Sequence, residues 1–292
     1  MKQFALDMMT RLGIPKDAQD VFTKLSDKLN SLREYVHCIN IYDGSDIQSE
    51  NVIKKLDEIS KKISENNYSV YYVFFLECLD KMYEKYIVKN IDTSVFCETI
   101  KDLKYKFDEC LSVKGVFGTF VPNWFGQFYR ADRFSLGRFQ YEIVDFPYDR
   151  YEKDGINIKK GDLVLNIHIP SSGPMDKKSR EASYKMALDF YKKNFNFTPK
   201  AFVCSTWLFN PDHYKFLSDS SNIIGFMNDF DIIEERIDAN FEYRWRIFGK
   251  FSDLPFNKLP HNTSLQKAYA DWMLAGNVAK TGYGIKIIKQ KR

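Results

Sequence analysis

Apolar residues recur at helical spacing over the first 112 residues of the chain. In segment 51–63 they stand three and four residues apart, as on one face of an amphipathic helix, at Val52, Leu56, Ile59 and Ile63. A second helix is predicted from about Lys16, with Val21, Leu25 and Leu29 inward. Segment 68–88 is apolar almost all round at its start, which is typical of the central helix of a bundle. A further helix is predicted over 94–110, so the pattern indicates an α-helical domain that packs on and supports the rest.

From about residue 134 the period of the pattern changes to two. Phe139, Tyr141 and Ile143 alternate with polar or smaller neighbours, which predicts a strand that is antiparallel to its neighbour. A short strand is predicted over 156–158, between turn residues, and the next run of strand character begins at once at residue 162. These segments predict a meander of short strands.

Residues 161–209 read as a strand, a loop, a helix and a second strand. The helical pattern rests on Ala182, Met186 and Phe190, which recur at four-residue spacing. Such a unit usually has parallel strands joined by a crossover helix. Its ligand tends to lie at the C-terminal end of the first strand, over the N-terminus of the helix, which here is residues 167–180.

The remaining elements are weaker in pattern. Asn210 and Pro211 give the signal of a short helix that carries Tyr214 and Leu217 on one face. Residues 231–249 alternate between apolar and charged, which favours a strand or hairpin. A helix follows over about 262–275, and the last predicted strand is 281–288, TGYGIKII.

The linking segment 111–135 is rich in glycine and aromatic rings, with Trp124, Phe125, Phe128 and Tyr129 at helical spacing. Two interpretations are open for these rings. They form core between domains, as ring stripes at this spacing usually do, or they line a hydrophobic acyl or aromatic pocket.

Composition narrows the class of protein. The 292 residues are 44% hydrophobic and 28% charged, as in soluble globular proteins, and 16% are aromatic. The net charge of +4 is too small to predict nucleic-acid binding. No apolar run reaches the roughly 18–20 residues of a membrane span, and the start lacks the apolar core of a signal peptide, so we expect a cytoplasmic protein without a membrane role. The five cysteines are scattered and form no CxxC pair, which predicts buried thiols without a disulfide framework or metal site.

Several phrases of the chain resemble a known family. They are LGRFQYE (136–142), GDLVLNIHIPSSGPM (161–175), CSTWLFNP (204–211), SNIIGFMNDF (221–230) and LPHNTSLQKAYADWMLAGN (259–277). They resemble a bacterial two-domain acyltransferase-like family, in which a helical N-terminal domain precedes a domain similar to the GNAT-type acyl-CoA N-acyltransferases. The resemblance covers essentially the whole chain. It implies an α+β or α/β fold, with an α-helical domain and linking segment at 1–133 and a GNAT-like domain at 134–292, whose mixed β-sheet is flanked by helices.

The same resemblance implies a function. A protein of this kind moves an acyl group from acyl-CoA, its co-substrate, to a small-molecule amine or peptide acceptor by direct attack in a ternary complex. The runner-up is a non-catalytic ligand-binding protein on a degenerate GNAT fold. The sequence predicts neither the oligomeric state nor the acyl chain length.

The expected CoA site departs from the family pattern. GNAT enzymes usually carry a Q/R-x-x-G-x-G/A loop whose backbone N–H groups hold the pyrophosphate, whereas this chain has SSGPMDKK at 171–178. One glycine is kept, and Pro174 has no N–H to donate. The resemblance places pantetheine along the backbone near Ile167 and Ile169. The residues expected to hold pyrophosphate are Ser171, Ser172, Gly173, Lys177, Lys178 and Arg180. A simple capped loop is the alternative, because Asp176 is a natural N-cap.

Three residues are candidates for proton transfer. His168 shares a strand face with Val164 and Asn166, and a histidine side chain titrates near neutral pH. Glu142, on a strand among rings, is the other candidate base. The resemblance makes Tyr214 the residue that protonates the departing thiolate. Each also has a plain structural interpretation.

Other chemistries find less support in the sequence. Cys204 with His168 would form a nucleophilic pair for covalent acyl transfer, although a buried thiol is the ordinary role of such a cysteine. The sequence contains no HExxH, Walker, GxSxG or CxxC motif, so a metalloenzyme, an ATPase and a classical hydrolase are not expected.

Overall fold

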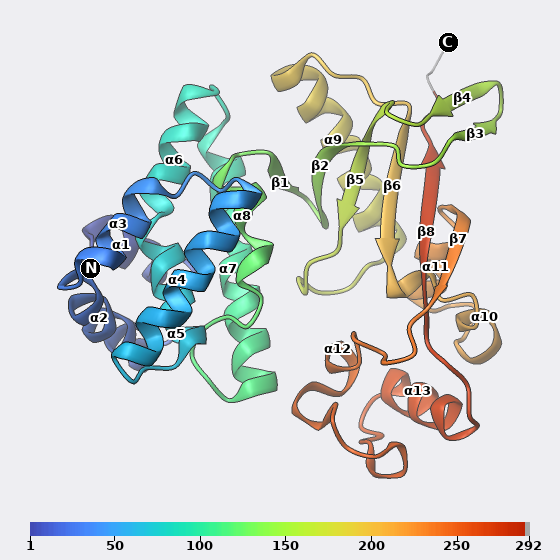
Figure 1. Cartoon of the computed structure of the whole chain (residues 1–292). Helices are drawn as coiled ribbons and strands as arrows, with labels where there is room; N and C mark the ends of the chain where they lie inside the picture. The colour runs from blue at the N-terminus through green and yellow to red at the C-terminus, as the bar shows by residue number, and fades with distance from the viewer. Residues whose placement is uncertain (290–292) are drawn as a thin grey trace. The chain divides into compact units, whose positions relative to one another are not determined.

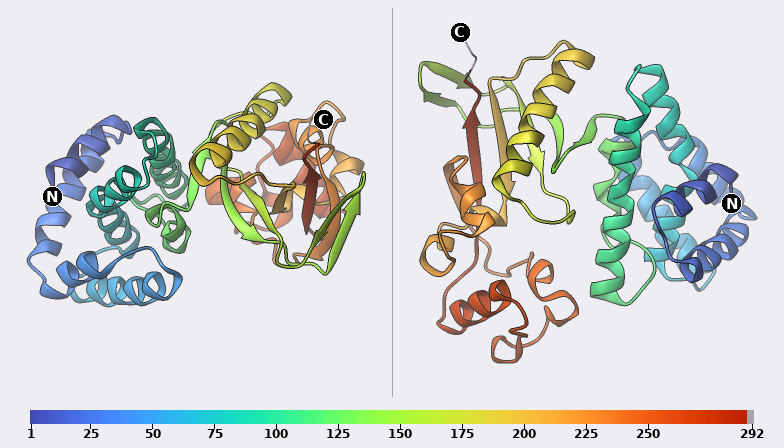
Figure 2. Two further views of the ribbon diagram at one scale, coloured as in Figure 1. Left: turned by 90° about the horizontal axis from the view of Figure 1, so that it is seen from above. Right: turned by 180° about the vertical axis from the view of Figure 1, so that it is seen from behind.

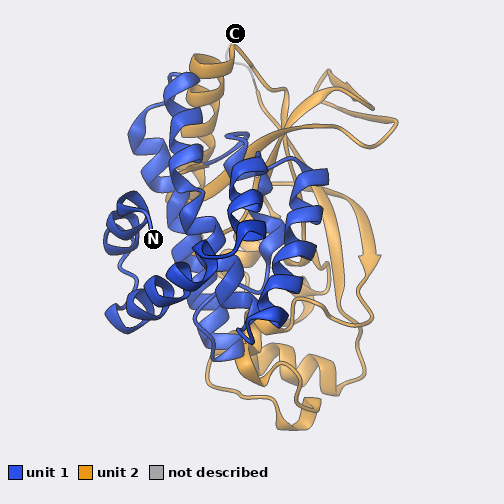
Figure 3. Cartoon of the chain, turned by 60° about the vertical axis from the view of Figure 1, so that its left-hand side comes forward, with its two compact units in different colours: residues 1–134 blue, residues 135–292 orange. Residues whose placement is uncertain are grey.

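The computed structural model describes residues 1–289 and divides into two compact units, residues 1–134 and the residues from 135 onward (Figure 3). The predicted domains, 1–133 and 134–292, stay a prediction as independently folding parts. No helix among the described residues is long and apolar enough to cross a membrane.

The first unit is helical. Its elements are α1 (Gln3–Arg11), α2 (Lys16–Asn30), α3 (Arg33–Ile41), α4 (Asp46–Lys62), α5 (Asn67–Glu77), α6 (Leu79–Val88), α7 (Thr93–Lys114), the 3₁₀ turn η1 (Pro122–Trp124) and α8 (Gly126–Tyr129). Every residue of α5 from Ser69 to Glu77 is buried, which agrees with its apolar surface on all sides. The single helix predicted over 68–88 is wrong in one respect, because the chain breaks at Cys78 into α5 and α6. The break lets α5 stay buried while amphipathic α6 exposes Ile87 and Val88.

The helix predicted from Lys16 is confirmed as α2, but its inward face differs by one residue. Val21 is exposed, and Phe22 is buried in its place. Ala18, Phe22, Leu25 and Leu29 stand four, three and four residues apart, which keeps them on one stripe of the helix.

The second unit is built on a mixed sheet of order β1-β2-β5-β6-β8-β7 (Figure 1). Its strands are β1 (Arg133–Leu136), β2 (Phe139–Asp145), β5 (Leu163–His168), β6 (Ala201–Thr206), β7 (Asp231–Ile237) and β8 (Lys280–Ile287); β3 (Arg150–Lys153) and β4 (Ile156–Lys159) form a separate hairpin. Strand β5 is antiparallel to β2 and parallel to β6. The crossover helix between β5 and β6 is α9 (Lys177–Phe195), so the strand–helix–strand unit predicted over 161–209 is confirmed.

Helix α9 covers one face of the sheet (Figure 2). The stripe predicted for it is wrong by one position, because Ala182 and Met186 are exposed while Ser183 and Ala187 are buried. Ser183 is tolerated inside because its hydroxyl lies 2.9 Å from the Tyr141 hydroxyl and donates to a backbone carbonyl. A buried serine with partners therefore takes the place of an apolar residue.

The other face of the sheet carries a second apolar cluster. Its buried members include Phe146, Val164, Val203 and Ile285. The alternation of side chains along each strand puts Cys204 on the α9 face and Val203 on the opposite face.

The chain beyond β6 forms the 3₁₀ turn η2 (Trp207–Phe209), α10 (His213–Phe216) and α11 (Asn222–Met227) before β7, then α12 (Trp245–Phe248), the 3₁₀ turns η3 (Gly249–Phe251) and η4 (Phe256–Lys258), and α13 (Ser264–Leu274) before β8. The strand or hairpin predicted over 231–249 is thus correct only to Ile237, where the paired part ends. Helix α13 is capped by Thr263, whose side chain accepts from the N–H of Gln266.

Candidate active site

Strands β5 and β6 pair over a short stretch and then separate. In the described chain their partners are Leu165 with Phe202 and Asn166 with Val203. Both strands continue beyond this register, to His168 and to Thr206, without further pairing between them. Parallel neighbours in a sheet normally stay about 4.8 Å apart along their length, so the early end of the pairing marks a divergence at the C-terminal ends of the strands.

Three polar side chains meet beside this divergence. Glu142 on β2 lies directly opposite Asn166 on β5, and His168 is two residues further along the same strand. The His168 Nε2 atom lies 2.6 Å from Glu142 Oε1, and Asn166 Nδ2 donates to the same oxygen at 3.1 Å. Sequence reasoning placed Asn166 and His168 on one strand face, and the structure adds Glu142 to that face.

His168 Nε2 has two close neighbours in this triad, Glu142 Oε1 at 2.6 Å and Asn166 Nδ2 at 3.0 Å, and the tautomer of the ring decides which of them it bonds. Because a carboxylate only accepts hydrogen bonds, the tautomer that bonds Glu142 is the one with the proton on Nε2. The neutral ring then has Nδ1 as its acceptor atom. The side chains of His168 and Glu142 are 18% and 12% exposed, so water screens the contact between them only weakly.

Arg138 holds the loop that follows β5. Its Nε donates to the carbonyl oxygen of Pro174 at 3.0 Å, and its Nη2 donates to that of Gly173 at 3.0 Å. Its Nη1 donates to the carbonyl oxygen of Pro170 at 3.0 Å and to Ser172 Oγ at 3.1 Å. One guanidinium thus gathers several carbonyl groups of the loop, and Gly173 adopts a φ of +105° that side-chain-bearing residues avoid.

The N-terminus of α9 is capped from within the chain. Asp176 accepts the N–H of Ser179 at 3.0 Å and its hydroxyl at 2.6 Å. These hydrogen bonds lower the pKa of Asp176. An aspartate at this position occupies one helix N–H and adds a negative charge where a phosphate would bind.

Arg180 is buried and donates hydrogen bonds both to the loop and to α11 and its end. Its Nε donates to Asp229 at 2.8 Å, its Nη1 to the carbonyl oxygen of Met175 at 2.8 Å and its Nη2 to that of Gly225 at 2.8 Å. These contacts give Arg180 a structural role between the loop and α11. Its direct contact with a phosphate stays a prediction.

The other residues expected to hold CoA differ in exposure. The side chain of Ile167 is buried and that of Ile169 partly buried, so they offer backbone rather than side chain. Ser171, Gly173, Lys177 and Lys178 are exposed, and Ser172 is partly buried. Their contact with a ligand stays a prediction.

Tyr214 and Cys204 are not among the side chains of the triad. Tyr214 is 49% exposed on α10, and its hydroxyl donates to Asn228 Oδ1 at 3.0 Å. Burial raises its pKa, which keeps the hydroxyl protonated at neutral pH. Cys204 faces α9, whereas His168 faces the opposite side of the sheet, so the Cys204–His168 nucleophile pair considered from the sequence is not formed. Burial also raises the pKa of the Cys204 thiol, which disfavours the reactive thiolate.

Two residues of this unit were missed by sequence reasoning. Arg138 carries no local signal of its role, since nothing in the neighbouring sequence shows that it binds a loop more than thirty residues away. His213 is fully buried, with Nδ1 at 3.1 Å from the carbonyl oxygen of Leu208 and Nε2 bonded to the Tyr269 hydroxyl. Burial lowers the pKa of His213 to about 4, so it is neutral at physiological pH.

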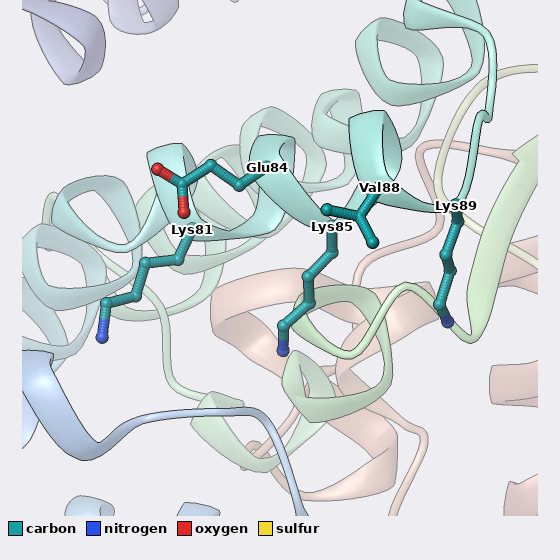
Figure 4. A pocket seen from close by; sticks show the side chains of 5 residues that line it. All are labelled: Lys81, Glu84, Lys85, Val88 and Lys89. Carbon is teal, nitrogen blue, oxygen red and sulfur yellow. The ribbon is translucent and has the colours of Figure 1, made fainter.

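A cavity of about 360 Å³ in the first unit is lined by α6 and its end. Figure 4 shows Lys81, Lys85 and Lys89 extending from one side of the helix. Their ammonium groups donate to backbone carbonyl oxygens, including those of Asn40 at 2.8 Å and Ala131 at 2.7 Å. Because these ammonium groups already donate hydrogen bonds to carbonyl oxygens, we interpret the cavity as structural rather than as an anion site.

The chain is similar to known protein families and to several solved structures. The family model described as "GNAT-like C-terminal domain" matches residues 134–286, and that described as "N-acyltransferase N-terminal domain" matches residues 3–131. No curated protein matches the sequence. Among solved structures, an acyltransferase in complex with decanoyl-CoA and teicoplanin is similar at a TM-score of 0.76 and 17% identity, covering 98% of this chain and 88% of that one. An acyltransferase in complex with decanoyl-CoA is similar at 0.64 and 18% identity, covering 98% and 99%.

Proposed function

The chain belongs to a two-domain acyltransferase-like family with a GNAT-like C-terminal domain, and from this premise we propose that it transfers an acyl group from acyl-CoA to an amine. The observation that supports the proposal most is the divergence of β5 and β6 after Asn166 and Val203. In GNAT folds the corresponding strands splay apart to admit pantetheine, the amide-bearing arm of CoA.

The proposed binding mode uses backbone groups. Amides of the pantetheine arm pair with the strand backbone at Ile167–Ile169, as an added strand pairs with a sheet edge. The pyrophosphate then lies at the loop Ser171–Gly173 and the start of α9, near Lys177 and Lys178. Arg138 supports this loop by binding its carbonyl groups, which leaves the loop in one conformation before CoA arrives.

We assign the base role to His168. An amine attacks a thioester only as the neutral species, so the proton that it carries in the addition step must move to an acceptor. Nδ1 of His168 accepts this proton, and Glu142 stabilises the imidazolium through Nε2. Asn166 holds the carboxylate in place. Glu142 acting directly as the base is the alternative, and the variants proposed in the Discussion distinguish the two.

Tyr214 is the proposed acid that returns a proton to the thiolate. Its raised pKa keeps it protonated, and its partial exposure leaves it accessible to a substrate. Activity of Tyr214→Phe tests this assignment. A loss in kcat that is restored with acyl donors of more acidic thiol would support it, and an unchanged kcat would remove it.

The acceptor class is proposed as a small-molecule amine or an amine on a peptide. One similar structure is a complex that contains teicoplanin, which supports peptide-like acceptors as the first compounds to test. The similar structures that contain decanoyl-CoA and octanoyl-CoA support medium-chain donors beside acetyl-CoA.

Calorimetry with the full chain tests the proposal. CoA, acetyl-CoA and decanoyl-CoA are titrated separately, and release of free CoA thiol is then followed with a panel of amine acceptors. We expect binding of at least one CoA species and acceptor-dependent thiol release. If none of these three CoA species binds at millimolar concentrations, the acyltransferase proposal is wrong.

A second candidate function is ligand binding without catalysis. Asp176 favours it, because this side chain caps α9 where a pyrophosphate would lie. CoA binding without thiol release to any acceptor would support this candidate over the enzyme.

A further inference from the structure

The chain between β7 and β8 packs around an aromatic cluster of its own. Phe241 stacks on Tyr269 at 5.3 Å between ring centroids, and Trp272 and Met273 on α13 are buried beside them. Phe241 and Met273 of this cluster also line a cavity that none of the steps proposed above uses.

The cavity has a volume of about 260 Å³ and is mostly apolar. Its lining includes Phe241, Arg244, Phe256, Met273, Val278 and Ala279. Phe256 and Val278 are 39% and 48% exposed, so apolar groups reach solvent at its mouth. Concave apolar sites with a few polar groups are the usual form of small-molecule pockets.

Arg244 is the charged group of this cavity. Its guanidinium lies 5.0 Å from the centroid of the Phe256 ring, and its Nη2 donates to the carbonyl oxygen of Leu254 at 2.7 Å. Its Nε is buried and has no hydrogen-bond partner, and no carboxylate within residues 1–289 forms an ion pair with it. Burial lowers the pKa of Arg244, although Asp253 opposes this effect. A partly buried guanidinium whose Nε has no partner pays a desolvation cost that Asp253 offsets only in part, and a bound anion would lower this cost.

The backbone of the lining adds an independent observation. Phe241 has a φ of +45°, a left-handed conformation that a bulky residue rarely adopts. Backbone strain of this kind is costly and is found most often at functional sites. Here it directs a ring into the cavity wall, where the ring stacks on Tyr269.

We propose that this cavity binds the carboxylate of a small molecule with an aromatic or branched apolar body, with Arg244 as the carboxylate ligand. Guanidinium and carboxylate match in planar geometry and form paired hydrogen bonds. The apolar body lies against Phe241, Met273 and Val278. The site is independent of acyl-CoA binding, so it survives if the proposed acyl transfer fails.

Met273 provides a direct reporter for the test. Met273 lines the cavity, and the chain has 8 methionines, so the others serve as internal references in spectra of protein labelled with ¹³C-methyl methionine. The full chain is titrated with phenylacetate, with no CoA present, and with phenylacetamide as the neutral analogue. We expect phenylacetate to shift the Met273 signal at concentrations roughly tenfold lower than phenylacetamide, as a charge-assisted hydrogen bond requires.

A carboxylate could come from a free small acid or from the C-terminus of a peptide. N-acetylphenylalanine and its amide form the second pair of probes, because they place the carboxylate beside a peptide bond. Tighter binding of phenylacetate identifies a free small acid as the source of the carboxylate, and tighter binding of N-acetylphenylalanine identifies a peptide C-terminus.

Variants complete the experiment. Arg244→Gln should weaken the binding of phenylacetate at least tenfold, and Arg244→Lys should keep part of it. Arg236→Gln is the matched control, since Arg236 is an exposed arginine of β7 that pairs with Glu234 outside the cavity. Unchanged signals from the other methionines show that each variant is folded. No shift of Met273 with either acid, an equal shift with the amides, or full binding by folded Arg244→Gln overturns the proposal.

Discussion

Asn166 on β5 lies opposite Val203 on β6 at the end of the pairing between these strands, and the same Asn166 side chain donates to Glu142 at 3.1 Å. The point where the sheet opens is therefore tied directly to the carboxylate that holds His168. In the proposed binding mode, a group held between the ends of β5 and β6 lies beside the strand that carries this histidine. The proposed acyl transfer requires such an arrangement, because the thioester and the base must lie close together.

His168→Ala should lower kcat by about 10²–10⁴-fold while the dissociation constant for CoA stays unchanged. The reason is that, in the proposed mode, the imidazole of His168 accepts a proton but does not contact CoA. Calorimetry and thiol-release kinetics measure the two quantities separately. His261→Ala is the control, since His261 is an exposed histidine of the same unit.

Glu142→Gln distinguishes the two proposed bases. If His168 is the base, this variant keeps a hydrogen-bond acceptor beside Nε2 and retains part of the activity, about 10- to 100-fold below the native chain. If Glu142 is the base, its loss matches or exceeds that of His168→Ala. Equal activity of both variants and the native chain would contradict the site altogether.

Arg138→Met should weaken the binding of CoA roughly tenfold, because several carbonyl groups of the loop lose their common donor and the loop no longer has one conformation. Pantetheine lacks the pyrophosphate, so its binding should change little. Arg150→Met is the control at an exposed arginine of β3. If Arg138→Met weakens both ligands equally, the loop does not bind the pyrophosphate.

Cys204→Ala should keep nearly full activity. The thiol faces α9, on the opposite face of the sheet from His168, and burial raises its pKa. The substitution leaves a small cavity, so we expect a loss of about 1 kcal/mol in stability. Thermal unfolding and thiol-release rates check the two effects, and activity that disappears while the fold persists would restore the covalent mechanism.

The sequence predicted the parts of this fold in which each segment carries its own pattern. The alternation of Phe139, Tyr141 and Ile143 identified β2, and the crossover unit from β5 to β6 was visible because apolar strands flank a helical period. The family resemblance was also correct, since family models match both domains, although the phrases that carried it all lie within the C-terminal match. In each case the signal was local.

The errors arise where tertiary contacts override local pattern. Periodicity counts apolar side chains, so it chose Ala182 and Met186 over Ser183, whose buried hydroxyl finds partners on β2 and at the end of β1. Arg138 carries no local mark of its loop contacts, because its partners lie more than thirty residues away. Such positions depend on packing between segments, which no single stretch of sequence records.

His213 makes the second unit sensitive to acid. Burial lowers its pKa from 6.5 to about 4, so the unfolded chain binds a proton more readily than the folded chain. Stability is therefore fully present above pH 6.5 and decreases as the pH falls toward 4, by about 3 kcal/mol in total for this group. Hydrogen exchange of the peptides over 207–217 and 264–274 measures this loss locally, because Trp207 and Tyr269 surround the imidazole. His213→Gln should be less stable at pH 7 but lose less stability between pH 6.5 and 4, whereas His261→Gln should retain the native slope. An unchanged slope in His213→Gln would assign the acid sensitivity to another group.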